Sequence, residues 1–336
     1  MKENDNNDSE VVLSVRNLKT CLKLKGSLYP VVNGISFDLK KGKTLAILGE
    51  SGCGKSMTAF SLIKVLPKPP AQEPTGKVLF EGKNLLSLTD KELRKIRGKK
   101  IGMIFQNPMT ALNPVFTIGD QIMEVVNLHL NLYNQEAFNK IIEMLKEVGI
   151  PEPEKRFFEY PHQLSGGMQQ RVMIAMALIC EPDILIADEP TTALDVTVQK
   201  QVLYLMKELQ RKKGTAILLI THDMGVVAEV ADDIVVMYAS YAMEKGSIQS
   251  VFKHMAHPYT QGLFNSLPKK NTARGALSAI EGIVPDLDQI STGCPFFPRC
   301  KKALEKCKTT PLKTFNAYGE KEHQVQCFLH EESQSV

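Results

Sequence analysis

The chain has 336 residues, of which 43% are hydrophobic and 23% charged, and its formal net charge is only +4. This length can bury a sizeable core, but no uninterrupted apolar stretch reaches the roughly 18 residues of a membrane-spanning helix, since the longest candidate, 172–187, is broken by Glu181-Pro182-Asp183. The start, MKENDNNDSE, is polar and lacks an apolar signal core, so we expect a disordered segment at 1–10 and a protein that stays in the cytoplasm.

The first expected elements are β-strands. Apolar residues alternate through residues 13–37, and Asn33-Gly34 is predicted to form a turn between strands. The apolar run 44–48 predicts a buried strand, and residues 57–66 predict a helix. A proline-rich break follows at 67–74.

The sequence GESGCGKS, at 49–56, lies between that strand and that helix and fits the P-loop pattern. Its glycines let the backbone curl so that N–H groups point at phosphate oxygens, and the following helix N-terminus adds positive potential. Lys55 is expected to reach the β- and γ-phosphates of ATP, and Ser56 to ligate Mg²⁺. The other residues expected to form the nucleotide site are Gly49, Glu50, Ser51, Gly52, Cys53, Gly54 and Met57. A plain glycine turn is the alternative, and the strand and helix around the loop argue against it.

Six basic residues crowd the segment 91–100, around Glu92. A solvated helix face is the simpler interpretation. A patch for anionic lipid head groups or nucleic acid is the alternative, and it lacks interleaved aromatic residues.

A helical region is expected next, after a short strand at 101–105. Apolar spacing becomes helical over 118–149, and a further helix is expected at 168–179. The sequence LSGGMQQR, at 164–171, places a glycine pair at the start of that helix, which makes a second anion-binding helix N-terminus.

The sequence ILIADE, at 184–189, is an apolar strand that ends in two carboxylates. A buried parallel strand delivers charge to the sheet edge in this way. Asp188 is expected to hold Mg²⁺, and Glu189 to act as general base on the attacking water. A helix is expected at 196–211, followed by strands at 216–221 and 234–238.

These three motifs, in this order, resemble those of the ATP-binding subunits of ABC transporters. The resemblance implies an α/β P-loop fold of the ABC ATPase type over residues 11–240, with an antiparallel β lobe and a helical lobe at about 107–180 that carries the signature. It also implies a C-terminal extension at 241–336. In that family the signature, here Ser165, Gly166 and Gly167, contacts the γ-phosphate of ATP on the opposite subunit, so the enzyme works as a dimer.

Further site residues follow from the same resemblance. Gln106 matches the glutamine that senses Mg²⁺ and the attacking water and that touches the membrane subunits. Asp195, in Ala193-Leu194-Asp195, matches the loop at the dimer interface, and His222 matches the histidine that binds the γ-phosphate. With Lys55 and Glu189 also present, we expect a catalytically competent subunit.

Two departures from the family pattern stand out. The adenine-stacking aromatic residue is missing near Cys21 and Leu22, and Tyr29 is the candidate replacement. Ser240-Tyr241 stands where relatives usually have glycine and a basic residue, and the sequence suggests no function for this change.

The chain resembles ATPase subunits of oligopeptide and dipeptide importers in segments 106–122, 162–178 and 257–263. Nickel importers share much of the sequence of these segments. The expected partners are a second homologous ATPase in a heterodimer, two transmembrane permease subunits and an extracytoplasmic solute-binding protein, without nucleic acid. The expected location is peripheral, at the cytoplasmic face of the inner membrane. A nickel or small-solute importer is one alternative. An ABC ATPase acting on nucleic acid or ribosomes is the other, although neither an inserted coiled coil nor a second ATPase unit is evident.

The extension contains four cysteines, Cys294, Cys300, Cys307 and Cys327, separated by five, six and nineteen residues. Zinc sites commonly use pairs spaced two to four residues apart, whereas the spacing of iron–sulfur ligands varies more. Spacing alone leaves a cluster, a zinc ion or unligated thiols open. Several peptide-importer ATPases carry a similar tail that binds a four-iron four-sulfur cluster, so the resemblance favours a cluster.

Overall fold

The computed structural model describes residues 10–191, 195–266, 280–290 and 292–331. The segment expected to be disordered, 1–10, lies outside these residues except for Glu10. The chain forms two compact units. The first takes in the residues up to 12, 39–43 and 87–219, and the second takes in 13–38, 44–86 and 220–336.

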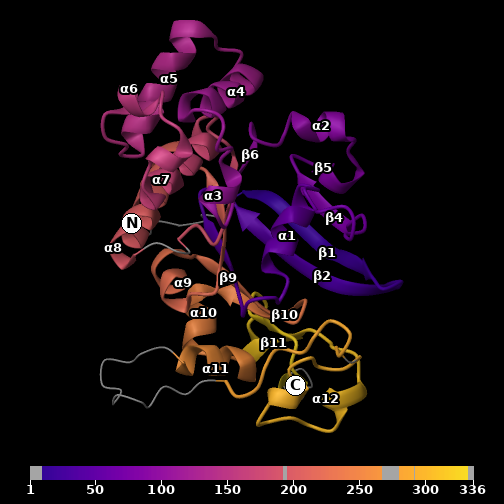
Figure 1. Cartoon of the computed structure of the whole chain (residues 1–336). Coiled ribbons are helices and arrows are strands. Elements are labelled where there is room, and N and C mark those ends of the chain that lie inside the picture. Colours follow the sequence, from indigo (N-terminus) through magenta and orange to yellow (C-terminus); the bar gives the residue numbers. More distant parts are fainter. Residues whose placement is uncertain (1–9, 192–194, 267–279, 291, 332–336) are drawn as a thin grey trace, which may run out of the picture. The chain divides into compact units, whose positions relative to one another are not determined.

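The first unit combines parallel strands with a group of helices (Figure 1). Strand β6 (Ile101–Ile104) pairs in parallel with β7 (Ile184–Asp188), with Ile101 opposite Ile184, and β8 (Ala216–Thr221) lies on the other side of β7. Every residue of β7 is buried, as a parallel strand with an unbroken apolar run requires. The helices are α2 (Asp90–Arg94), α3 (Pro108–Ala111), α4 (Ile118–Leu130), α5 (Asn134–Glu147), α6 (Pro153–Arg156), α7 (Gly166–Leu178) and α8 (Val196–Lys213), with a 3-10 turn at Pro161–Gln163.

Local signals explain where these helices begin and end. Thr117 and Asp120 form a capping box at the start of α4, and Asn131 ends that helix in the left-handed region. Gly214, with φ 72°, ends α8. The described residues between β6 and β7 contain helices and loops but no strand, and the helical lobe expected at about 107–180 stays a prediction.

The second unit contains an antiparallel sheet in the order β2-β1-β4-β5. Its strands are β1 (Val11–Leu24), β2 (Ser27–Lys40), β4 (Thr75–Phe80) and β5 (Lys83–Asn84). The turn expected at Asn33-Gly34 is wrong, because both residues lie inside β2. The chain turns instead at Lys25-Gly26, where φ is 49° and 85°, as a two-residue hairpin requires.

A second run of strands in this unit has the order β11-β12-β10-β9-β3. Strands β3 and β9 are parallel, whereas β10 pairs antiparallel with both β9 and β12. The strands are β3 (Thr44–Leu48), β9 (Asp233–Tyr238), β10 (Tyr241–Ser247), β11 (Phe315–Asn316) and β12 (Gln324–Val325). The helices are α1 (Lys55–Leu62), α9 (Met224–Val230), α10 (Ile248–Lys253), α11 (Pro258–Asn265) and α12 (Lys306–Thr309), with 3-10 turns at Leu85–Ser87, Phe297–Arg299, Ala317–Gly319 and Phe328–His330.

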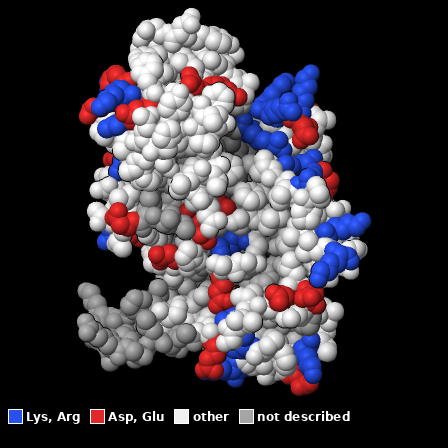
Figure 2. All heavy atoms as spheres, viewed as in Figure 1, with Lys and Arg blue, Asp and Glu red and all other residues white. Residues whose placement is uncertain are grey.

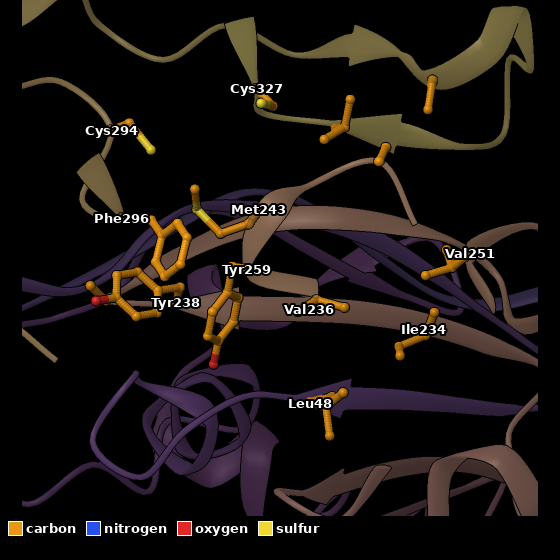
Figure 3. Close-up of a cluster of buried hydrophobic side chains, with 14 of the residues drawn as sticks. Leu48, Ile234, Val236, Tyr238, Met243, Val251, Tyr259, Cys294, Phe296 and Cys327 are labelled. Carbon is orange, nitrogen blue, oxygen red and sulfur yellow. The ribbon is translucent and has the colours of Figure 1, made fainter. Parts of the chain in front are cut away.

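One hydrophobic core joins β3, the strand that precedes the P-loop, to the C-terminal segment, by which we mean the chain from residue 241 onward (Figure 3). It contains Leu48 of β3 and Tyr238 of β9 together with Tyr259 of α11, Phe296 and Cys327. Residues on both sides of the domain boundary expected at 240 therefore share this core. The boundary itself stays a prediction. No helix in the described ranges is both long and apolar enough to cross a bilayer.

Candidate functional site

The P-loop is formed as the sequence predicts, between β3 and α1 in the second unit. Gly54 caps α1 with φ 101°, a left-handed conformation that favours glycine. A Cβ added at Gly49 would lie 2.2 Å from the carbonyl oxygen of Met237, and one added at Gly54 would lie 2.1 Å from that of Val31. Glycine is therefore required at both positions because neighbouring backbone leaves no space.

The Lys55 ammonium lies inside the curl of this loop. Its Nζ donates to the carbonyl oxygens of Gly49, at 2.9 Å, and Glu50, at 3.0 Å, and the residue is only 5% exposed. Ser56 and Met57 follow in the first turn of α1, while Ser51 and Gly52 form the exposed outer edge of the loop. The loop thus presents a lysine and a helix N-terminus together, the arrangement that binds phosphate.

Cys53 and Tyr29 differ in their relation to this loop. Cys53 is completely buried, and burial raises the pKa of its thiol to about 11. Its side chain therefore serves packing within the loop. Tyr29, the candidate adenine contact, lies half-buried in β2, two residues before Val31, whose carbonyl packs on Gly54.

Ser240 supports the P-loop, a role that the sequence did not suggest. Its backbone N–H donates to the carbonyl of Cys53 at 3.0 Å, and its hydroxyl donates to the carbonyl of Pro30 at 2.8 Å. Ala239 and Ser240 have φ of 43° and 73°, so they form a tight turn between β9 and β10 where glycine would be easier. The one sequence signal that could have indicated this role was the serine at position 240, where relatives usually have glycine.

The C-terminal segment also reaches the loop, through Glu50. The Glu50 backbone N–H donates to the Tyr259 hydroxyl, and the Glu50 carboxylate is paired with Arg299. No local sequence signal indicates either contact, because the partners lie 209 and 249 residues away along the chain.

His222 directly follows β8 and is exposed. The next residue, Asp223, caps α9 by accepting hydrogen bonds from the backbone N–H groups of Gly225, at 2.7 Å, and Val226, at 3.2 Å. His222 therefore lies between the end of β8 and the capped start of α9.

In the first unit, the structure brings Gln106 and Glu189 together. The Gln106 Nε2 donates to the Glu189 carboxylate at 2.9 Å. Asp188 and Glu189 end β7 and are 1% and 8% exposed, and Glu189 has φ 45°, an uncommon conformation for a residue other than glycine. The predicted base is thus held by both its backbone and the predicted glutamine.

The signature forms an exposed helix N-terminus, as predicted. Ser165 caps α7 by accepting from the Met168 N–H at 3.3 Å, and a Cβ at Gly166 would meet nothing within 4 Å. Asp195 caps α8, since its carboxylate accepts from the N–H groups of Thr197 and Val198 at 3.0 Å each. Ala193 and Leu194, which precede it, lie outside the described residues.

The four predicted cysteine ligands line one cavity, together with His257, Phe297 and Phe328 among others. All four are free thiols, and the Cys294 N–H donates to the carbonyl of Cys307 at 2.7 Å. Burial raises the pKa of Cys294 to about 12 and that of Cys327 to about 11. Within the described ranges, no three His, Cys, Asp or Glu side chains are arranged to hold a metal ion.

The basic run at 91–100 is only partly helical, because α2 ends at Arg94. Figure 2 shows a group of Lys and Arg side chains over this region. Beyond α2 the chain turns at Gly98, and Arg94, Lys95, Arg97, Lys99 and His129 line a shallow surface hollow. The solvated helix face expected from the sequence thus extends into a basic loop.

Comparison with known families gives two matches. The model described as "ABC transporter" matches residues 32–192, and "Oligopeptide/dipeptide transporter, C-terminal region" matches residues 243–307. The resemblance found from the motifs is thereby confirmed.

Curated relatives match over almost the whole chain. The dipeptide transport ATP-binding protein DppD of Bacillus subtilis is 50% identical over 324 residues, 96% of each chain. The oligopeptide transport ATP-binding protein OppD of Escherichia coli is 46% identical over 303 residues, covering 90% of this chain and 89% of OppD.

A solved structure agrees. It is the dimeric post-hydrolysis state of the ATP-binding cassette MJ0796 bound to ADP and Pi, with a TM-score of 0.63 and 28% identity. The match covers 70% of this chain and 98% of that one. The chain therefore belongs to the family of ABC transporter ATP-binding proteins, ATP hydrolases built on a P-loop fold, and it carries the oligopeptide/dipeptide transporter C-terminal region.

Proposed function

We propose that this chain is the ATP-hydrolysing subunit of an importer for oligopeptides or dipeptides. The observation that carries the proposal is the match of residues 243–307 to the C-terminal region of such transporters, on a chain with a complete set of nucleotide motifs. Curated relatives along nearly the whole length are named as dipeptide and oligopeptide transport proteins, which supports the substrate class.

In this proposal ATP binds with its phosphates in the P-loop. Lys55 exchanges its bonds to the loop carbonyls for bonds to phosphate, and Ser56 and Asp188 hold Mg²⁺. Glu189, held by Gln106, takes the proton of the attacking water, and His222 binds the γ-phosphate. The signature of a second ATPase completes each site, so ATP closes the pair and hydrolysis releases it.

The substitution Glu189→Gln tests the chemistry. The amide cannot accept a proton, so we expect ATP binding to persist while turnover falls by a factor of about 10² to 10⁴, the usual contribution of a general base. Glu229→Gln, at an exposed position of α9, is the matched control and should leave turnover unchanged. Near-normal hydrolysis by Glu189→Gln would remove Glu189 from this role.

The segment after Gln106 supports docking to membrane subunits at the cytoplasmic face of the membrane. Met109, Val115 and Phe116 are 74%, 71% and 52% exposed, and large apolar side chains exposed this close together along the chain favour an interaction site. Purification of the tagged protein from native membranes in mild detergent should recover two permeases, a second ATPase and a solute-binding protein.

The solute-binding protein recovered in this way would identify the cargo, including nickel if that alternative holds. A Met109→Glu, Val115→Glu variant should lose the permeases and keep ATP binding, whereas Tyr204→Glu, at an exposed residue of α8, should keep both. Recovery of ribosomes or DNA without membrane proteins would refute the importer.

We also propose that Cys294, Cys300, Cys307 and Cys327 hold a four-iron four-sulfur cluster. Two observations support it: the four thiols line one cavity, and none forms a disulfide. Thiolates are the ligands that such clusters use, and metal binding would deprotonate the thiols, among them Cys294 and Cys327, whose pKa burial has raised. When bound, the cluster would cross-link the segment through iron–thiolate bonds.

Anaerobic purification should then give a brown protein that contains iron and sulfide. Cys300→Ser should lose both, and Cys21→Ser, outside the quartet, should lose neither. A colourless protein with stoichiometric zinc, or with no metal, would refute the cluster and leave the ATPase proposal untouched.

A further inference from the structure

Glu50 adds a carboxylate to the P-loop, the segment proposed to bind the phosphates of ATP. Its side chain is 26% exposed, and its carboxylate is paired with Arg299 of the C-terminal segment. The two bonds are a fork: the Arg299 Nη1 donates to Oε2 at 2.7 Å, and Nη2 donates to Oε1 at 3.2 Å. Such a two-point pair fixes direction as well as charge.

Arg299 is itself held rigidly. Its side chain is 7% exposed, and its guanidinium lies over the rings of Tyr238, at 5.6 Å, and Phe296, at 5.9 Å. Its Nε and Nη2 also donate to the carbonyls of Glu281 and Ile280, at 3.0 Å and 3.2 Å. The pair with Glu50 therefore costs little additional ordering.

The backbone of Glu50 has a second anchor in the same segment. Its N–H donates to the Tyr259 hydroxyl at 3.0 Å, and Tyr259 is completely buried in α11. The Glu50 carbonyl is one of the two oxygens that accept from the Lys55 ammonium. The C-terminal segment thus fixes the residue that in turn holds the phosphate-binding lysine.

We propose that Arg299 and Tyr259 are positioning residues for ATP binding. Arg299 neutralises the Glu50 carboxylate, which would otherwise repel the phosphates, and Tyr259 fixes the backbone that shapes the loop. This inference rests on the ATPase activity of the family and not on the identity of the transported substrate.

The test compares Arg299→Gln, Glu50→Gln and the double variant in the full-length chain. ATP Kd would be measured with a fluorescent ATP analogue, and KM and kcat by phosphate release. Arg299→Gln leaves Glu50 uncompensated, so Kd and KM should rise roughly ten-fold, as one added charge repulsion predicts, with kcat little changed. The double variant should recover most of this loss because the repelling charge is gone.

The control removes a different cation of the same segment. Lys301 pairs with Glu281 and both side chains are more than 80% exposed, so Lys301→Gln should leave Kd unchanged. A purely structural role for Arg299 would lower the melting temperature without a rescue of Kd by Glu50→Gln. Tyr259→Phe keeps the packing, loses only the acceptor, and should raise KM several-fold even if Arg299→Gln fails to fold.

The proposal is wrong if Arg299→Gln binds ATP within two-fold of the unaltered protein, or if the double variant binds as weakly as Arg299→Gln. An unchanged KM in Tyr259→Phe would remove Tyr259 from the arrangement.

Discussion

Glu244 joins three segments of the second unit through a single buried carboxylate. It lies in β10 with a completely buried side chain and accepts three hydrogen bonds. Oε1 accepts from the Ala256 N–H and from the His323 Nε2, and Oε2 accepts from the His257 N–H, each at 2.8 Å. Its loss would release both the start of α11 and the chain before β12.

We expect Glu244→Ala to destabilise the protein by about 4 kcal/mol or more. Each buried donor left without a partner costs about 1 to 3 kcal/mol, and the missing side chain adds a cavity. Glu244→Gln keeps the shape and one oxygen, but its amide N–H₂ would face a second donor, so we expect a loss of about 2 kcal/mol. The order of stability should be Glu, then Gln, then Ala.

Thermal unfolding followed by far-UV circular dichroism measures this, since the chain has no tryptophan. At about 2 °C per kcal/mol for a chain of this size, Glu244→Ala should lower the Tm by about 8 °C or more. Glu320→Ala, at an exposed position, should change it by less than about 1 °C. A shift below 2 °C for Glu244→Ala would refute the claim that these donors depend on this carboxylate.

Three further predictions concern single positions. Gly54→Ala should abolish nucleotide binding because its Cβ would collide with backbone. Gly52→Ala has open space around its Cβ and should only weaken binding, through backbone strain at φ 80°. Titration with a fluorescent ATP analogue would measure both. Asp195→Ala removes the N-cap of α8 and should cost about 1 kcal/mol in urea denaturation, with Asp195→Asn recovering most of it. Cys53, with a pKa of about 11, is about 0.1% thiolate at pH 8, so iodoacetamide should modify it far more slowly than the partly exposed Cys21; equal rates would contradict its burial.

The parts of the fold that the sequence predicted rest on local signals. The apolar run before Gly49, the glycine pattern and the strand ending in Asp188-Glu189 are each contained within a few residues. Where local signals conflicted with pairing, the prediction failed: Asn33-Gly34 suggests a turn, yet β2 runs through it because the hairpin already closes at Gly26.

The contacts that shape the loop around Glu50 could not be predicted in this way. Arg299 and Tyr259 are distant from Glu50 in sequence. No spacing pattern around an arginine or a buried tyrosine predicts which residue it will contact. Ser240 could be noticed only as a departure from the family, and its hydrogen bonds to Cys53 and Pro30 depend on strands that meet only in the folded chain.

The pairing of Glu50 with Arg299 limits how such proteins can exchange parts during evolution. A chimera that joins the P-loop of one homologous ATPase to the C-terminal segment of another brings together two halves of an ion pair from different ancestors. Where the donor segment brings arginine to a loop without an acidic residue, the buried guanidinium has lost its partner. Recombination within this family should therefore succeed when both residues are inherited together.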